Sequence, residues 1–257
     1  MLGRIYHNLG NSYSNEAGVD NNLELLHRAI SYYRSSLGSI QKFGSPTDLA
    51  LKDWVIGRAY ERLKLYDSAI LQFQNGISRL MHEFKKQDLS SPPPLQPTLS
   101  DSRFISLVTN KANNFYYKYR VHQDVEDLLA AFQHYEFLLR FNNYLLSQSK
   151  NEQEAIEWNR LYGSNAYQSL VAVAYELLEK TKDKSYLMKA YGLLASAKYA
   201  WLNKNDIVPA LGNSIGSSIL KKEINLVKQN ILNSIPDLTN DNLTNYGLKI
   251  HRFEYID

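Results

Sequence analysis

Apolar residues recur along most of the chain at spacings of three and four residues, which is the period of an amphipathic helix. The pattern predicts helices grouped in pairs. The clearest pair runs from Leu51 to Leu80, where steps of three, nine, four and three residues separate Gly57, Tyr60, Ala69, Phe73 and Gly76. Gly57 and Ala69 are small and would let the two helices approach closely. Tyr60 and Phe73 would fill the gap between them, and Gly76 would admit the next helix.

Three further helix pairs match this one more loosely. Each centres on an alanine with a leucine three residues before it, and these are Ala29 with Leu26, Ala131 with Leu128, and Ala190 with Leu187. Nineteen residues separate each alanine from the matching residue of its first helix, which is Gly10, Ala112 or Val171, against twelve between Gly57 and Ala69. Tyr13 follows Gly10 by three residues, as Tyr60 follows Gly57.

The spacing resembles the tetratricopeptide repeat, a helix-turn-helix unit of about 34 residues. Single pairs of this kind cannot bury their apolar faces, and stacking them makes one continuous core with a concave inner surface. The resemblance therefore implies an all-α fold, a right-handed helical solenoid. With 44% hydrophobic residues, 19 tyrosines and 9 phenylalanines among 257 residues, the chain has ample material for that core.

The predicted organisation has five parts. Residues 1–87 hold repeats 1 and 2, 88–101 a proline-rich loop, 102–202 degenerate repeats 3 and 4, 203–235 a loop and a capping helix, and 236–257 a C-terminal tail. Four of the seven prolines lie in the loop and exclude a helix there. We expect 90–98 to be exposed and dispensable for folding, and the PxxP spacing of Pro94 and Pro97 leaves a ligand motif as the alternative. Leu248 and Ile250 alternate with polar residues, which is typical of a strand. A lone strand has no partner in a helical solenoid, so we expect the chain to be part of a longer protein.

Composition excludes several kinds of chemistry. The chain has no cysteine, so a disulfide, a thiol nucleophile and a Cys-ligated metal are impossible. No apolar run approaches the ~20 residues of a membrane span. A net charge of +3 is too small to indicate nucleic acid, and none of the six histidines has metal-ligand spacing. We expect no cofactor, no metal, no membrane or nucleic-acid partner, a cytoplasmic location, and no enzymatic activity, because no acid, base and nucleophile converge.

The stretch 154–202 resembles the last helical pairs before the peptidase domain of CHAT proteins, whose caspase-like domain is associated with tetratricopeptide repeats. Thr181 to Asp183 match a turn of that family, although Lys182 replaces its glycine, and Ser217 stands where the family often has proline. The catalytic His and Cys of the peptidase have no counterpart here. The resemblance implies the non-catalytic, N-terminal part of a larger protein.

Two functions are compatible with this resemblance: a protein- or peptide-binding scaffold, or an intramolecular arm that controls an attached peptidase domain. In the repeat family, residues of the first helix line the concave groove, and asparagines there bind peptide backbone. The matching candidates are Asn8, Asn11, Asn110 and Asn113, with Trp54 and Arg58 in repeat 2. Chance placement is the alternative for the asparagines and packing the alternative for Trp54, while Arg62 is expected to be solvated.

Overall fold

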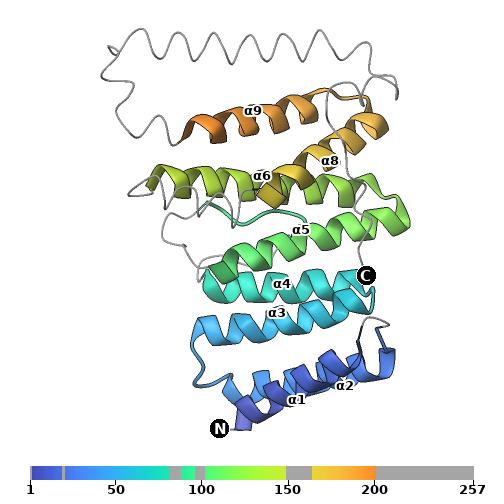
Figure 1. The fold of residues 1–257 in the computed structure, drawn as a ribbon, viewed down its shortest axis with the longest axis vertical. Helices are drawn as coiled ribbons and strands as arrows, with labels where there is room; N and C mark the ends of the chain where they lie inside the picture. Colours follow the sequence, from blue (N-terminus) through green and yellow to red (C-terminus); the bar gives the residue numbers. More distant parts are fainter. Residues whose placement is uncertain (1, 19–20, 82–87, 96–101, 149–163, 201–257) are drawn as a thin grey trace. The chain divides into compact units, whose positions relative to one another are not determined.

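Helices make up nearly all of the chain that the structure, a computed structural model, describes: residues 2–18, 21–81, 88–95, 102–148 and 164–200. They are α1 (Leu2–Glu16), α2 (Leu23–Ile40), α3 (Pro46–Arg62), α4 (Tyr66–Leu80), α5 (Ser102–His122), α6 (Val125–Gln148), α8 (Ser164–Thr181) and α9 (Ser185–Ala200). No strand occurs within these ranges, so the predicted all-α class is confirmed for them (Figure 1). The expected capping helix, Ser217 and the strand at Leu248 and Ile250 lie outside the described residues.

The chain divides into two compact units, 1–138 and 139–257, and the boundary falls inside α6. In the first unit each of the first four helices packs against the next, and α3 also contacts α5. In the second unit α8 packs against α9. Helices that follow one another in the sequence are therefore neighbours in space within each unit, as helix pairs require (Figure 1).

Two glycines lie directly against an aromatic ring of the partner helix. A methyl group added at Gly10 would lie 2.5 Å from the ring of Tyr33, and one added at Gly57 would lie 2.5 Å from the ring of Phe73. Both rings are buried. The close approach predicted at Gly57 is thus confirmed, and Gly10 makes a contact of the same kind.

Gly76 separates one helix pair from the next. A methyl group there would come within 2.6 Å of Leu107 on α5, so Gly76 admits the next helix as predicted. The alanines that centre the four pairs, Ala29, Ala69, Ala131 and Ala190, are all 0% exposed. The leucines that precede three of them, Leu26, Leu128 and Leu187, are buried as well. The alanines and leucines that define the predicted spacing of the helix pairs therefore lie in the core.

Tyr13 and Tyr60 lie against a cluster shared by α2 and α3, which contains Ala29, Ile30, Tyr33, Ile56 and Ala59. The guanidinium of Arg34, on α2, donates to the Tyr60 hydroxyl and lies 5.7 Å from its ring centre. Tyr60 thus also joins its own helix to the preceding pair, a contact that the pattern within repeat 2 does not reveal.

A residue with positive φ follows the first helix of every pair. These are Gly18 (φ 60°), Lys64 (φ 58°), Gln123 (φ 60°) and Lys182 (φ 61°). Glycine adopts this left-handed conformation at the lowest steric cost, and helices commonly end this way. Lys182, which replaces the turn glycine of the resembled family, keeps the backbone conformation for which glycine is favoured.

The proline-rich segment packs against the first unit over part of its length. Ser90, Pro94 and Leu95 are exposed, but Pro93 is buried and Ser91 and Pro92 are half-buried. The prediction of a fully exposed loop was therefore wrong for 91–93. Two interactions explain the difference: Asp88 accepts hydrogen bonds from Ser90 and Ser91, and the Ser91 carbonyl accepts one from Lys111 on α5. Residues 96–98 lie outside the described ranges.

Candidate binding surface on the first helices

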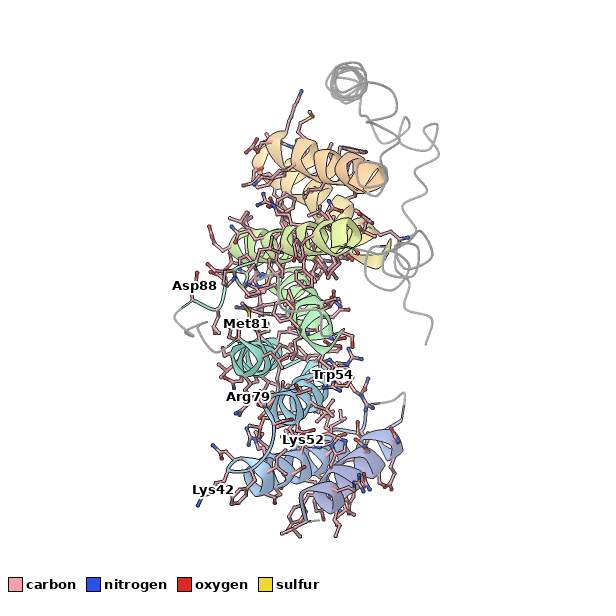
Figure 2. The ribbon with its side chains drawn as sticks, turned by 90° about the vertical axis from the view of Figure 1, so that its left-hand side faces the viewer. Lys42, Lys52, Trp54, Arg79, Met81 and Asp88 are labelled. Atoms are coloured by element: carbon pink, nitrogen blue, oxygen red, sulfur yellow. The ribbon has the colours of Figure 1, made fainter. Side chains whose placement is uncertain are left out.

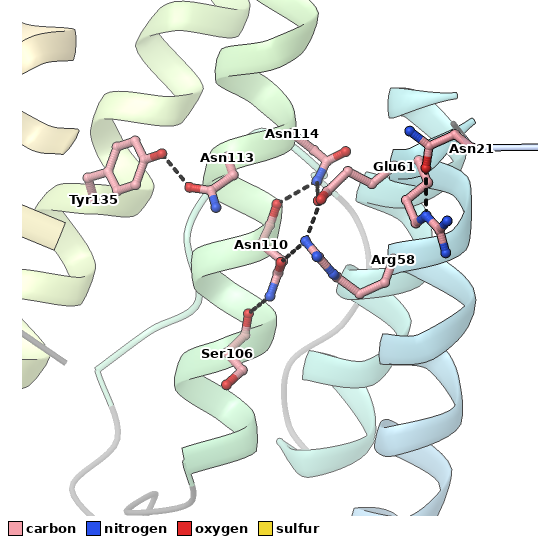
Figure 3. A network of polar contacts seen from close by, with 9 residues as sticks. Asn21, Arg58, Glu61, Ser106, Asn110, Asn113, Asn114 and Tyr135 are labelled. Carbon is pink, nitrogen blue, oxygen red and sulfur yellow. Dashed lines mark hydrogen bonds and ion pairs between the residues drawn. The ribbon is translucent and has the colours of Figure 1, made fainter. Parts of the chain in front are cut away.

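A polar seam joins α3 and α5, the first helices of the predicted repeats 2 and 3 (Figure 3). Arg58 forms an ion pair with Glu61 on its own helix, and its Nη1 donates to Asn110 Oδ1 across the interface at 3.2 Å. Asn114 Nδ2 donates to Glu61 Oε2 at 2.6 Å. We call these four residues, Arg58, Glu61, Asn110 and Asn114, the A-helix seam.

Helical spacing brings the seam residues together. Glu61 follows Arg58 by three residues and Asn114 follows Asn110 by four, so each pair lies on one face of its helix. The Nδ2 group of Asn110 also donates to the Ser106 carbonyl at 2.7 Å, and that of Asn114 to the Asn110 carbonyl at 2.8 Å. These bonds fix the carboxamide orientations. Sequence reasoning missed Glu61 and Asn114, although their helical spacing from Arg58 and Asn110 is visible in the sequence.

The two charges of the seam differ in exposure. The Arg58 side chain is 44% exposed and the Glu61 side chain 12%. Burial raises the pKa of the Glu61 carboxyl, while the Arg58 charge and the hydrogen bonds from Asn114 and Arg58 act in the opposite direction. The seam therefore presents its guanidinium to solvent and keeps its carboxylate covered.

Asn11 and Asn113 make the same internal contact in two helix pairs, α1 with α2 and α5 with α6. The Tyr33 hydroxyl donates to Asn11 Oδ1 at 2.9 Å, and the Tyr135 hydroxyl donates to Asn113 Oδ1 at 2.6 Å. In both cases the tyrosine follows the asparagine by 22 residues and stands on the second helix of the pair. These carboxamide oxygens connect the two helices of a repeat, whereas Asn8 is exposed on α1.

We expect Asn113→Ala to lower the free energy of unfolding by about 0.5–1.5 kcal/mol, the usual net value of one hydrogen bond. Tyr135→Phe removes the same bond from the other side and should cost a similar amount. Because both changes remove one interaction, the double variant should be less destabilised than the sum of the two. Chemical denaturation of the three variants gives the measurement, and full additivity would contradict the assigned contact.

Trp54 precedes Arg58 by one helical turn on α3. Its ring is half-buried, and its Nε1 atom is buried without a hydrogen-bond partner in the part of the chain that the structure describes. An anchor for an apolar ligand would present more of its ring to solvent. This placement favours the packing role over the ligand-binding role.

Arg62 closes the connection between α1 and α2. Its guanidinium donates to Asn21 Oδ1 at 2.7 Å, to the Ser14 carbonyl at 2.7 Å and hydroxyl at 2.9 Å, and to the Gly18 carbonyl at 2.6 Å. The expectation of a solvated side chain was wrong. Two of the acceptors are backbone carbonyls near the end of α1, where intrahelical donors are missing, so Arg62 satisfies them.

No family model, curated protein or solved structure matches this chain. Among the helices that the structure describes, none combines the length and apolar character needed to cross a membrane. Within the same ranges, no three His, Asp or Glu side chains gather where they could hold a metal ion. A function can therefore be inferred only from the A-helix seam and from the recurring contacts around it.

Proposed function

We propose that the chain is a non-catalytic scaffold of tetratricopeptide-like repeats, stacked as a right-handed solenoid, that binds a protein or an extended peptide. In this proposal it forms the N-terminal interaction region of a larger CHAT-type protein. The observation that supports the binding role best is the A-helix seam, where Arg58 is exposed and its carboxylate partner is covered. The binding surface is formed by α1, α3 and α5.

The chemistry of this surface suits a peptide. Arg58 offers a planar set of N–H donors, which pair with carboxylates or backbone carbonyls, and carboxamides such as Asn8 supply both a donor and an acceptor. The repeat arrangement is supported by the glycine contacts of Gly10 and Gly57 and by the hydrogen bonds of Asn11 and Asn113, which recur at corresponding positions.

The test compares two double variants as baits in a pull-down from the source cell. Asn8→Ala with Arg58→Ala changes the proposed surface and leaves the tyrosine contacts of Asn11 and Asn113 intact. The control, Glu24→Ala with Arg28→Ala, removes an exposed ion pair of 2.6 Å on α2. Any partner captured by the unmodified chain is then measured for affinity against both variants.

We expect the Asn8 and Arg58 variant to bind its partner roughly tenfold more weakly, because two lost hydrogen bonds at about 0.5–1.5 kcal/mol each exceed the 1.4 kcal/mol of a tenfold change. The control should bind as the unmodified chain does. Equal affinity of all three baits for every captured partner would place the binding surface elsewhere.

A further inference from the structure

Lys111 is an uncommon residue for the interior of a helical protein. Its side chain on α5 is 0% exposed. The ammonium nitrogen donates to Gln74 Oε1 on α4 at 2.7 Å and to the Ser91 carbonyl at 3.3 Å, and it lies 5.8 Å from the Phe115 ring centre. No ion pair between Lys111 and a carboxylate occurs among the residues that the structure describes. Both hydrogen-bond acceptors are neutral.

The Ser91 carbonyl belongs to the segment Asp88–Leu95, which we call the strap. Its Asp88 carboxylate accepts from the Ser90 amide at 2.8 Å and the Ser90 hydroxyl at 2.6 Å, which shapes the turn before Ser91. Pro93 is buried, although the neighbouring Pro94 is exposed. Because Lys111 Nζ reaches the strap backbone, the strap covers the amino end of this side chain.

Burying an ammonium group without a carboxylate partner is costly. The surroundings contain little to offset the cost: Gln74 on α4 is neutral, and Asp88 on the strap is exposed. On α6, His134 is fully buried with Nδ1 2.8 Å from the Ala130 carbonyl, and burial lowers the pKa of its ring to about 3, which keeps it uncharged. Burial likewise lowers the pKa of Lys111 to about 7, with Asp88 acting in the opposite direction.

We propose that the strap is a proton-driven cover, which lies closed over neutral Lys111 and lifts when Lys111 takes up a proton. A lysine that reaches water regains its hydration, whereas a charged lysine under the closed strap has only two neutral acceptors. Proton uptake therefore favours the open strap by linkage. Asp88 and Trp54, which stands one helical turn before Arg58 on α3, lie on opposite sides of the first unit in Figure 2.

The absence of cysteine allows a direct test, because a single introduced thiol is the only reactive sulfhydryl. Pro93→Cys places the thiol at the buried position of the strap, and Ser90→Cys places it at an exposed position of the same segment. A small thiol reagent is applied to both variants from about pH 9 to about pH 6. We expect labelling of Pro93→Cys relative to Ser90→Cys to rise at least tenfold as the pH falls.

Pro93→Cys combined with Lys111→Met provides the matched control, since methionine keeps an unbranched side chain but cannot take up a proton. Its labelling relative to Ser90→Cys with Lys111→Met should not rise as the pH falls. Circular dichroism verifies that each variant is folded, and Lys111→Leu replaces Lys111→Met if the latter does not fold.

A Pro93→Cys thiol that is labelled as fast as Ser90→Cys at about pH 9 would show that the strap is not closed. A pH dependence that is the same with and without Lys111 would show that this lysine does not drive opening. Either result overturns the proposal.

Discussion

Gly57→Ala is expected to destabilise the protein by roughly 1–3 kcal/mol, the usual cost of overpacking a core. Alanine favours a helix over glycine by up to about 1 kcal/mol, so the expected sign is opposite to that of intrinsic propensity. The added methyl group would lie 2.5 Å from Phe73 Cε1 and 2.9 Å from Cδ1 and Cζ. Phe73 is 0% exposed, so neighbouring side chains enclose its ring.

Gly38→Ala provides the matched control in the same unit. Gly38 lies in α2, and a methyl group there would have no neighbour within 4 Å. This variant should be more stable than the unmodified chain by about 0.5–1 kcal/mol. Gly10→Ala should behave like Gly57→Ala, because its methyl group would meet the Tyr33 ring.

Urea denaturation of the three single variants measures these differences. If Gly57→Ala were stabilised to the same extent as Gly38→Ala, α3 and α4 would not approach at Gly57, and the repeat register would be wrong. A helical protein with another pairing of these helices would give that result.

Glycines and alanines at helical spacing were the most informative features of the sequence. A glycine within a helix lowers stability unless something needs the space, so Gly10, Gly57 and Gly76 predicted close neighbours. The structure gives each of them a side chain of another helix within 2.6 Å of the added methyl group. Local spacing was sufficient here because both helices of each pair are close in the sequence.

Contacts that depend on a loop conformation were not predictable in the same way. Arg62 donates to the Gly18 carbonyl and to the side-chain oxygen of Asn21, and both of these residues have positive φ in the connection between α1 and α2. Lys111 lies at helical spacing from Leu107, Val108 and Phe115, on the apolar side of α5, although its residue type favours a solvated position. Its contact with the Ser91 carbonyl depends on the path of the strap over α5. Residue type and periodicity carry no information about either path.

The binding role of the candidate residues stays a prediction. The shared offsets of Asn11 and Asn113 correspond to a shared contact of another kind, because the second helix supplies a tyrosine hydroxyl that uses their carboxamide oxygens. In repeat 2 the corresponding positions hold Arg58 and Phe73, and an aromatic ring without a hydroxyl cannot make this bond. Arg58 instead belongs to the A-helix seam, because its partner Asn110 is supplied by α5, in the next helix pair.

The stability of the unmodified chain should rise relative to that of Lys111→Met as the pH increases from about 7 to about 10. Burial lowers the pKa of Lys111 from its ordinary 10.5 to about 7. The unfolded chain regains the ordinary value, so between these pH values it binds more protons than the folded chain. Raising the pH therefore favours the folded state, and the difference between the two chains stays constant below about pH 7, where Lys111 is protonated in both states.

The expected change over this range is up to about 4 kcal/mol, since one proton bound only by the unfolded chain corresponds to roughly 1.4 kcal/mol per pH unit. It becomes smaller if the strap lifts and Lys111 reaches water before the helices unfold. Guanidinium denaturation of both chains at intervals of one pH unit gives the measurement, and the other titrating groups cancel because the two chains share them. Parallel stability curves across this range would mean that Lys111 titrates alike in the folded and unfolded chains, and that its amino group is not held under the strap.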